Sequence, residues 1–393
     1  ENTKFALDKT IDMLRIFTEK YGEYPFIKEK YGHAQFGFGG GMEHQTISSM
    51  GSFEETIVAH ELAHQWFGDK VTCKNWENIW LNEGFATYSE SIYLEAKYGK
   101  AAFMNDVQAN MNGAMNAQGP LYLKDISSVN SIFNYNRSYA KGAIVLHMLR
   151  GVMGDDNFFK AMRTYHDKPA FRYGVVTTED FQGVCEEISG ISLDYFFREW
   201  IYGENYPRYN IGWNQSLVPV TNKYKLLFRL KQTSNNNPQF FTMPFELKIG
   251  FGSGRDTTVA AFNSSKEEVF EFFVSEKPVS ITFDPNSKIL KEILSISSLR
   301  DESILPVEYS LSQNYPNPFN PTTIIEYSIP ISGNVKITLF DAIGKEVKEL
   351  VNKYEDRGYH KIELNAENLA SGIYIYKLEI NNFIDSKKMI LVK

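Results

Sequence analysis

The sequence predicts a multidomain protein in which a mainly α-helical domain is followed by two small all-β sandwich domains. Apolar residues recur every three to four positions up to about residue 210, at every second position between about 211 and 291, and again at every second position after residue 309. A spacing near 3.6 residues is that of an amphipathic helix, and a spacing of two is that of a half-buried strand. The chain of 393 residues is long enough for several domains.

The domain predicted for residues 1–210 consists mostly of helices. Its first helical pattern is marked by Leu7, Ile11, Leu14 and Phe17. Further helical patterns cover Phe53–Phe67, Glu83–Tyr98, Ala101–Met115, Ser138–Val152, Asp155–Tyr165 and Thr178–Ile188. Thr177 followed by Asp180 is typical of a helix start with a capping box. The glycine run at 37–41 predicts a loop or the edge of a strand.

Residues 211–291 and 309–393 are each predicted to form a small β-sandwich. Apolar residues alternate with polar or basic ones in both, for example at Leu226, Phe228 and Leu230, and at Val335, Ile337 and Leu339. The mixed, polar stretch 292–308 is predicted to be a linker. Pro316, Pro318 and Pro321 exclude a helix and a central strand, so the last domain should begin with a stiff, turn-rich segment.

Composition and charge exclude several classes of function. A net charge of −7 argues against a nucleic-acid-binding protein, which usually presents a basic face. No run of about 18 apolar residues occurs, so no transmembrane segment is predicted. The two cysteines, Cys73 and Cys185, are too few for a disulfide scaffold. Because the chain opens on Glu1 and shows no signal peptide, we expect a piece of a longer protein, with the N-terminal part of the first domain truncated.

The pentad His60-Glu61-Leu62-Ala63-His64 lies inside one helical pattern. Residues four apart share a helix face, so both imidazoles can bind the same metal ion. After a gap of eighteen residues, Glu83 begins the next helical pattern and can add a carboxylate ligand. Two histidines and one glutamate leave a coordination position open for water, as a catalytic zinc site requires. The sequence therefore predicts one zinc ion bound by His60, His64 and Glu83.

Two further residues have the chemistry that such a site needs. Glu61, next to the first ligand, can reach a metal-bound water without binding the metal, which makes it the candidate general base. The oxyanion that forms during the reaction needs a hydrogen-bond donor besides the metal. Tyr139 is a candidate donor, although a tyrosine taken from the 23 in the chain is more often a core residue.

Taken together, these residues resemble the aminopeptidase N and leukotriene hydrolase family of gluzincins, over about residues 1–290. The pentad, the eighteen-residue gap and the sequence Asn82-Glu83-Gly84-Phe85-Ala86 match the motifs of that family. The resemblance implies a thermolysin-like catalytic domain over residues 1–210 and a zinc-dependent aminopeptidase acting on peptide substrates. It also implies that Tyr139, in a Tyr-x-Lys-Gly-Ala sequence, stabilises the oxyanion.

The sequence Gly40-Gly41-Met42-Glu43-His44 is similar to the Gly-Ala-Met-Glu-Asn exopeptidase motif of the same family. The resemblance implies that Glu43 binds the α-amine of the substrate and that Gly40, Gly41 and Met42 contribute to substrate binding. Gly41 and His44 depart from the alanine and asparagine of the family motif, and these departures bear on fine specificity.

The last domain, residues 309–393, resembles the C-terminal sorting domains of the type IX secretion system of Bacteroidetes-like bacteria. The resemblance is carried by Tyr315–Pro321, Leu339–Lys345, Ala370–Tyr374 and Lys387–Lys393. It implies that the type IX secretion machinery is a partner and that the protein is secreted or attached to the cell surface. An accessory sandwich that binds carbohydrate or protein is the alternative for this domain.

Two other functions remain open from the residues alone. A thermolysin-like zinc endopeptidase would share the pentad but would have no use for Glu43. A surface binding module with a catalytically degenerate site would not need Glu61 or Tyr139. Turnover of N-blocked peptides would indicate the first alternative, and a lack of bound zinc at saturation would indicate the second.

Overall fold

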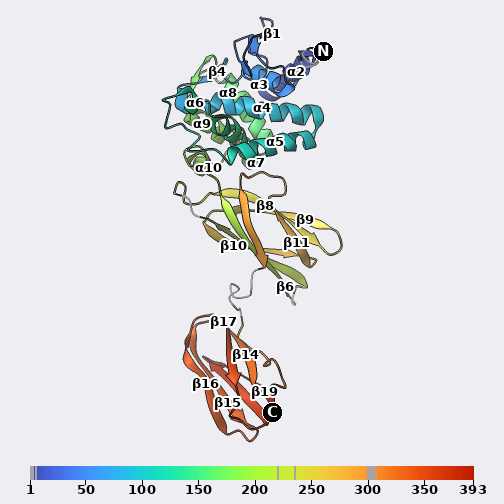
Figure 1. Ribbon diagram of the computed structural model, residues 1–393, viewed down its shortest axis with the longest axis vertical. Helices are drawn as coiled ribbons and strands as arrows, with labels where there is room; N and C mark the ends of the chain where they lie inside the picture. The colour runs from blue at the N-terminus through green and yellow to red at the C-terminus, as the bar shows by residue number, and fades with distance from the viewer. Residues whose placement is uncertain (1–3, 5–6, 219–220, 234–235, 299–305, 307) are drawn as a thin grey trace. The chain divides into compact units, whose positions relative to one another are not determined.

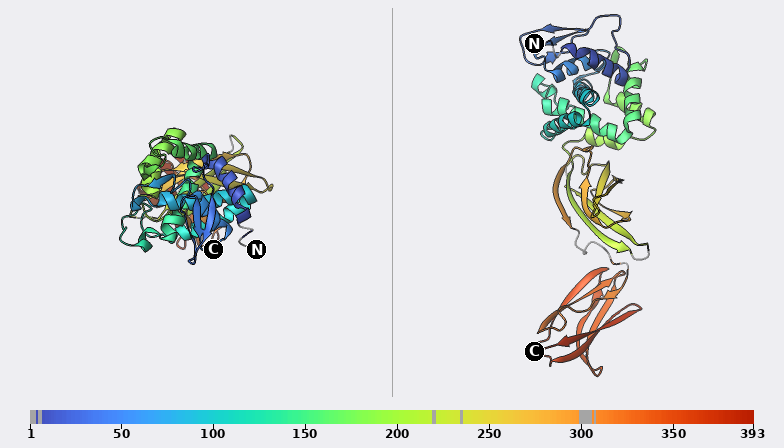
Figure 2. Two further views of the ribbon diagram at one scale, coloured as in Figure 1. Left: turned by 90° about the horizontal axis from the view of Figure 1, so that it is seen from above. Right: turned by 90° about the vertical axis from the view of Figure 1, so that its right-hand side faces the viewer.

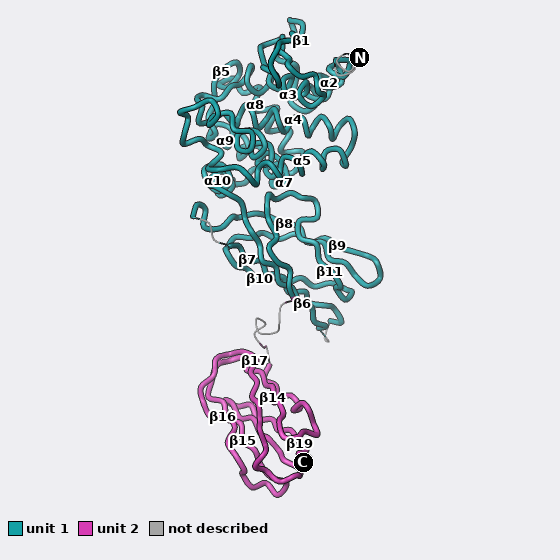
Figure 3. Tube along the Cα trace, viewed as in Figure 1, with its two compact units in different colours: residues 1–297 teal, residues 298–393 magenta. Residues whose placement is uncertain are grey.

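The computed structural model describes residues 4, 7–218, 221–233, 236–298, 306 and 308–393. These residues form two compact units, residues 1–297 and residues 298–393 (Figure 3). The first unit contains the helices and a β-sandwich, and the second unit contains a further pair of sheets. None of the described helices has the length and apolar character needed to cross a membrane.

The helices of the first unit pack together into one body, and the sandwich strands that follow them in the chain form a separate part of the unit (Figures 1 and 2). The helices are α2 (Thr10–Tyr21), α3 (Glu55–Ala63), α4 (Trp80–Tyr98), α5 (Lys100–Ala114), α6 (Val129–Ile132), α7 (Gly142–Met153), α8 (Asp155–Asp167), α9 (Thr178–Ser189) and α10 (Asp194–Trp200), with a 3-10 turn η1 (Trp76–Asn78) and a π-helix η2 (Tyr135–Lys141). The capping box predicted from Thr177 and Asp180 is confirmed, because the Thr177 hydroxyl accepts the Asp180 N–H and the Asp180 carboxylate accepts the Thr177 N–H.

Helix α4 lies at the centre of the helical body, and residues 80–89 are all buried. It crosses α7 at a close contact between two glycines. A Cβ atom on Gly84 would lie 2.8 Å from Gly142 Cα, and one on Gly142 would lie 2.7 Å from Gly84 Cα. Backbones this close require that neither residue has a side chain. Glu83 directly precedes Gly84, and η2 ends at Lys141, so the contact holds the start of α4 beside the end of η2.

Three short strands form a small sheet in the order β1-β3-β2. They are β1 (Gly32–Gln35), β2 (Gly41–Met42) and β3 (Ile47–Met50). β1 pairs with β3 in parallel, and β2 pairs with β3 in the antiparallel sense. A separate pair consists of β4 (Val71–Cys73) and β5 (Gly174–Val176), which run parallel. The loop or strand edge predicted for 37–41 is thus a loop that ends in β2.

The sandwich of the first unit has two sheets, ordered β10-β7-β6-β12 and β11-β8-β9. Its strands are β6 (Arg208–Val218), β7 (Lys223–Gln232), β8 (Met243–Phe251), β9 (Asp256–Asn263), β10 (Glu267–Val274), β11 (Pro278–Phe283) and β12 (Glu292–Ser298). Phe228 and Phe245 pack across the two sheets with ring centroids 5.5 Å apart. Glu199 of α10 joins the helices to this sandwich, because its carboxylate accepts both the N–H and the hydroxyl of Thr242.

The prediction that residues 292–308 form a linker is wrong for its first residues. Residues 292–298 form the edge strand β12, which lies beside β6. Most side chains of β12 are exposed on both faces, so the strand lacks the alternation of buried and exposed residues by which the other strands were predicted. Residues 299–305 and 307, also in the predicted linker, lie outside the described residues.

The second unit consists of two antiparallel sheets, ordered β13-β14-β17 and β16-β15-β18-β19. Its strands are β13 (Ser310–Leu311), β14 (Thr322–Ile329), β15 (Gly333–Asp341), β16 (Glu346–Glu355), β17 (Gly358–Asn365), β18 (Gly372–Ile380) and β19 (Phe383–Leu391). Asn314, which is 1% exposed, fixes the proline-rich segment at the start of this unit. The Asn314 N–H donates to the Tyr376 hydroxyl at 2.8 Å, and its amide donates to Thr323 Oγ1 at 2.9 Å.

Candidate metal centre and active site

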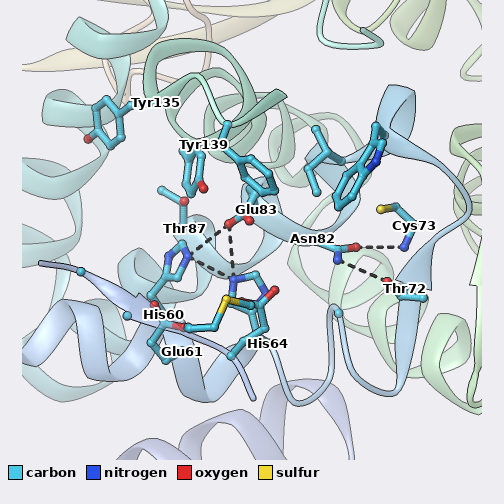
Figure 4. A pocket seen from close by; sticks show the side chains of 18 of the residues that line it. His60, Glu61, His64, Thr72, Cys73, Asn82, Glu83, Thr87, Tyr135 and Tyr139 are labelled. Atoms are coloured by element: carbon cyan, nitrogen blue, oxygen red, sulfur yellow. Dashed lines mark hydrogen bonds and ion pairs between the residues drawn. The ribbon is translucent and has the colours of Figure 1, made fainter. Parts of the chain in front are cut away.

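The side chains of His60, His64 and Glu83 point toward one another (Figure 4). His60 Nε2 and His64 Nε2 are 3.2 Å apart, and each lies 3.4 Å from Glu83 Oε2. His60 lies on α3 and His64 immediately follows it, while Glu83 lies in the first turn of α4. His64 is 1% exposed and Glu83 is 4% exposed. Three donor atoms, from the end of α3 and the first turn of α4, therefore face one buried point.

These distances fit one zinc ion. Zinc binds imidazole nitrogen and carboxylate oxygen at about 2.0–2.2 Å, and in a tetrahedral site two such donors lie about 3.3 Å apart. The three measured separations agree with this value. His60, His64 and Glu83 would hold the zinc ion and would leave a position free for water, as a catalytic zinc site requires and a structural one does not.

Neighbouring groups hold the two imidazoles in the orientation that a metal requires. His60 Nδ1 donates to Glu90 Oε1 at 2.9 Å, and His64 Nδ1 donates to the Phe67 carbonyl at 2.9 Å. With the proton on Nδ1, the lone pair of each Nε2 faces the metal position. Sequence reasoning missed Glu90. Its signal was its position seven residues after Glu83, which is two helical turns along the same face.

Asn82 fixes the start of α4 to strand β4. Its Oδ1 accepts the Cys73 N–H at 2.9 Å, and its Nδ2 donates to Thr72 Oγ1 at 3.3 Å. Because Glu83 is the next residue, these two bonds determine where the third candidate ligand enters the site. The side chain of Asn82 thus explains why an amide precedes the ligand in the sequence.

The charges around the metal position favour an ionised Glu83. Burial would raise the pKa of Glu83, but the adjacent His64 and His60 outweigh burial and lower it to about 2. Burial also raises the pKa of Glu61, with the two histidines opposing that effect. A glutamate whose pKa lies above its ordinary value is better suited to accept and release a proton near neutral pH.

Glu61 lies against Gly41 of strand β2. Glu61 is 5% exposed, and a Cβ atom on residue 41 would lie 2.3 Å from Glu61 Oε1 and 2.5 Å from Glu61 Cδ. The carboxylate of the candidate base therefore occupies the space that an alanine methyl group would need. This is a local steric reason for the departure of Gly41 from the alanine of the exopeptidase motif.

Replacing Gly41 by Ala is expected to lower kcat for the expected peptide hydrolysis by about tenfold or more. The methyl group forces the carboxylate of Glu61, the candidate base, to a new position, and small displacements of a catalytic group lower the reaction rate strongly. Zinc content should not change. Steady-state kinetics together with metal analysis measures both. Gly39→Ala is the matched control, since a Cβ there meets nothing within 4 Å. Equal kcat values in the two variants would contradict the steric argument.

Glu43 directly follows β2 and lies close to Glu61. One carboxylate oxygen of each, together with a ring nitrogen of His64, lies within 4.8 Å of the others. Gly40, Gly41 and Met42 line the same cleft, which has a volume of about 1200 Å³. Two carboxylates this close form a compact negative region that suits a primary ammonium group.

Tyr139 lies in the π-helix η2 and not in a regular α-helix. Its ring stacks on the His60 imidazole, with centroids 6.0 Å apart and planes 18° apart. Burial and the nearby Glu83 and Glu43 carboxylates raise the pKa of Tyr139. The phenol therefore stays protonated and can donate a hydrogen bond. Short π-helical segments of this kind occur often at functional sites.

Lys141, in the same π-helix, is 1% exposed. Burial lowers the pKa of Lys141 from 10.5 to about 8. The charge of Glu204 acts against this decrease in pKa, and the charge of Arg137 adds to it. Below about pH 8 the fold must bury a charged amine, at a cost on the order of 3 kcal/mol. Between pH 8 and 10.5 the unfolded chain binds more protons than the folded chain, so stability rises with pH.

Lys141→Met should therefore raise the melting temperature at pH 7 and remove the rise in stability between pH 8 and 10. Melting curves followed by calorimetry across this range test the prediction. Lys124→Met, at a lysine whose side chain is 64% exposed, is the control and should change neither. A wild-type melting temperature that does not rise over this range would contradict the prediction.

The structure brings all the residues predicted for the site to one cleft. The residues that line it include Gly40, Gly41, Met42, Glu43, His60, Glu61, His64, Glu83 and Tyr139. Cys73 also lines this cleft, and burial raises the pKa of its thiol to about 11. Trp76 and Tyr135 add aromatic surface, but no sequence motif marked them.

Residues 42–200 match the peptidase family M1 domain, and residues 313–393 match the secretion system C-terminal sorting domain. Aminopeptidase M1-B of Oryza sativa subsp. japonica is 31% identical over 228 residues, which cover 52% of this chain and 26% of the rice protein. Aminopeptidase N of Lactococcus lactis subsp. lactis is 32% identical over 161 residues, which cover 38% of this chain and 19% of that protein. The chain thus spans about a quarter or less of the length of these two relatives.

The fold is similar to that in the crystal structure of Legionella pneumophila aminopeptidase A in complex with aspartic acid. The TM-score is 0.60 at 19% identity, and the match covers 75% of this chain and 34% of the Legionella chain. At that identity the match concerns the fold alone. Residues 42–200 of this chain thus match a peptidase family M1 domain, and residues 313–393 match a secretion system C-terminal sorting domain.

Proposed function

We propose that this chain is a zinc aminopeptidase that hydrolyses N-terminal residues from peptides. The observation that carries the proposal is the position of Glu43. Its carboxylate lies within 4.8 Å of donor atoms of Glu61 and His64, in the cleft that also contains the three candidate zinc ligands. An ammonium group bound there would place the first peptide carbonyl of the substrate next to the zinc site.

The side chains support a division of roles in the reaction. Zinc, when bound, would supply an activated water and polarise the scissile carbonyl. Glu61 accepts a proton from the attacking water and delivers it to the leaving amine. The Tyr139 phenol donates a hydrogen bond to the oxygen on which negative charge develops. Glu43 holds the α-ammonium, and Gly40, Gly41 and Met42 lie along the peptide.

Charge makes this site selective for a free N-terminus. A peptide with a blocked amine brings no cation to Glu43, so two nearby carboxylates remain without compensation when the substrate covers the cleft. An unpaired charge removed from water is costly, whereas a charge-assisted hydrogen bond to an ammonium is favourable. An endopeptidase would lose affinity through Glu43 and gain nothing from it.

The experiment that tests the proposal compares aminoacyl-nitroanilides with their N-acetylated forms. The zinc-loaded protein should cleave the free-amine substrates with a kcat/KM at least about a hundredfold higher, the ratio expected from losing one charge-assisted bond and burying one unpaired charge. Equal turnover of both substrate forms would overturn the aminopeptidase proposal in favour of an endopeptidase. Absence of bound zinc at saturation would overturn both.

For the C-terminal domain, we propose export by the type IX secretion machinery of a Bacteroidetes-like bacterium, followed by release or attachment at the cell surface. The match of residues 313–393 to the sorting domain supports this proposal. Expression in a host that has this secretion system, with and without residues 309–393, provides the test. Equal amounts of protein outside the cells in both cases would contradict the proposal.

A further inference from the structure

The segment that carries Glu43 connects β2 to β3 and contains one residue in an unusual backbone conformation. Thr46 has φ +63°, in the left-handed region that β-branched residues rarely adopt. It is 9% exposed. Such a conformation persists only where the surrounding structure holds it, and it occurs often where a functional side chain must be placed.

Gln65 is the group that holds Thr46. Its Oε1 accepts the Thr46 N–H at 2.8 Å and the Tyr24 hydroxyl at 3.4 Å, and the side chain is fully buried. The Thr46 carbonyl is used as well, because it accepts the Gly32 N–H at 2.9 Å. Both backbone polar groups of Thr46 are therefore bound, one by the neighbouring strand and one by Gln65.

Gln65 directly follows the zinc ligand His64. The bond to Thr46 thus links the metal-binding segment to the amine-binding segment without any intervening element. Between Thr46 and Glu43 the chain is short and tied to itself, because the Ile47 N–H donates to the His44 carbonyl at 3.1 Å and the His44 N–H donates to the Met42 carbonyl at 2.9 Å. A shift of Thr46 is transmitted to Glu43 through this turn.

The carboxylate of Glu43 depends on this backbone for its position. Among the described residues, no hydrogen bond or ion pair to the Glu43 side chain occurs. Its distance from the zinc site is consequently set by the backbone of residues 42–46 and by the group that anchors that backbone. We propose that Gln65 is a positioning residue that sets the distance between Glu43 and the zinc ion, and with it the strictness of selection for a free α-amine. The proposal rests on the proposed aminopeptidase function.

The test is the variant Gln65→Met, which keeps the length of the side chain and removes the acceptor. We expect KM for aminoacyl-nitroanilides to rise about tenfold with kcat changed less than threefold, because a displaced Glu43 weakens amine binding while the zinc ligands stay in place. The preference for free over N-acetylated substrates should fall by the same factor of about ten. Zinc content, measured by metal analysis, should remain one ion per chain.

The matched control is Gln232→Met in the sandwich. Gln232 is 1% exposed. Its Oε1 accepts the Phe241 N–H at 2.8 Å, and its Nε2 donates to the Phe241 carbonyl and to Asn263 Oδ1, so this variant removes the same kind of buried acceptor bond, and two donor bonds besides, at a position outside the cleft. It should leave KM and the substrate preference unchanged. Gln65→Asn serves as a second variant, since it retains an amide but withdraws the acceptor by one methylene, and it should shift KM in the same direction.

Three results separate the possible failures. If wild type prefers free amines and both Gln65 variants keep the full preference, Gln65 does not position Glu43. If the Gln65 variants lose zinc, or lose kcat with unchanged KM, Gln65 supports the metal site and the proposal is wrong. If wild type itself shows no preference for free amines, the proposed aminopeptidase function has failed, and the positioning role fails with it.

Discussion

Replacing Glu61 by Gln is expected to lower kcat by about two to four powers of ten while the chain keeps one zinc ion. The amide has nearly the shape of the carboxylate but cannot accept the proton of the attacking water. Glu61 does not belong to the three donors that surround the metal position, which are His60, His64 and Glu83. Loss of the base should therefore leave metal binding intact.

Steady-state kinetics on a free-amine substrate and metal analysis of the purified variant measure the two quantities. Glu54→Gln is the matched control, because Glu54 is the exposed residue just before α3, the helix that carries Glu61. The control should retain wild-type kcat. A Glu61 variant with more than a tenth of wild-type kcat would show that another group accepts the proton, and loss of zinc would show that Glu61 acts as a ligand.

Replacing Tyr139 by Phe is expected to lower kcat by about a hundredfold to a thousandfold, with little change in KM. In the proposed mechanism the hydroxyl donates to the substrate oxygen as negative charge develops there, so its removal affects the transition state more than the bound substrate. The ring that stacks on His60 remains in the variant, and the metal site should remain as well.

Tyr135→Phe is the control for this prediction. Tyr135 lies on the same π-helix and lines the same cleft, and its ring stacks on Tyr139 with centroids 6.2 Å apart. It is 59% exposed, so loss of its hydroxyl should change kcat less than threefold. If the two variants lost activity equally, the effect would belong to the packing of the π-helix and not to a hydrogen bond from Tyr139.

The local part of the metal site could be predicted because helical periodicity alone determines it. His60 and His64 are four residues apart within one apolar pattern, and any helix through them places both imidazoles on one face. The same reasoning separated the helical region from the strands, because the spacing of apolar residues changes from about 3.6 to two. It failed for β12, whose exposed side chains give no such signal.

Contacts between distant residues required the tertiary structure. The gap before Glu83 has the right length, but the approach of α4 to η2 depends on the contact between Gly84 and Gly142. The hydrogen bond from His60 to Glu90, the steric fit of Gly41 to Glu61 and the bond between Gln65 and Thr46 likewise join segments that no periodicity relates.

The sequence by itself therefore predicted which residues would carry the proposed chemistry, namely two histidines, the glutamates 43, 61 and 83, and a tyrosine, and it determined which of them share a helical pattern. Only the tertiary structure decided how far apart they stand and which neighbours orient them. The physical reason is that side-chain direction along one helix follows from backbone geometry, whereas the separation of two elements is set by packing, where a single methyl group changes the distance.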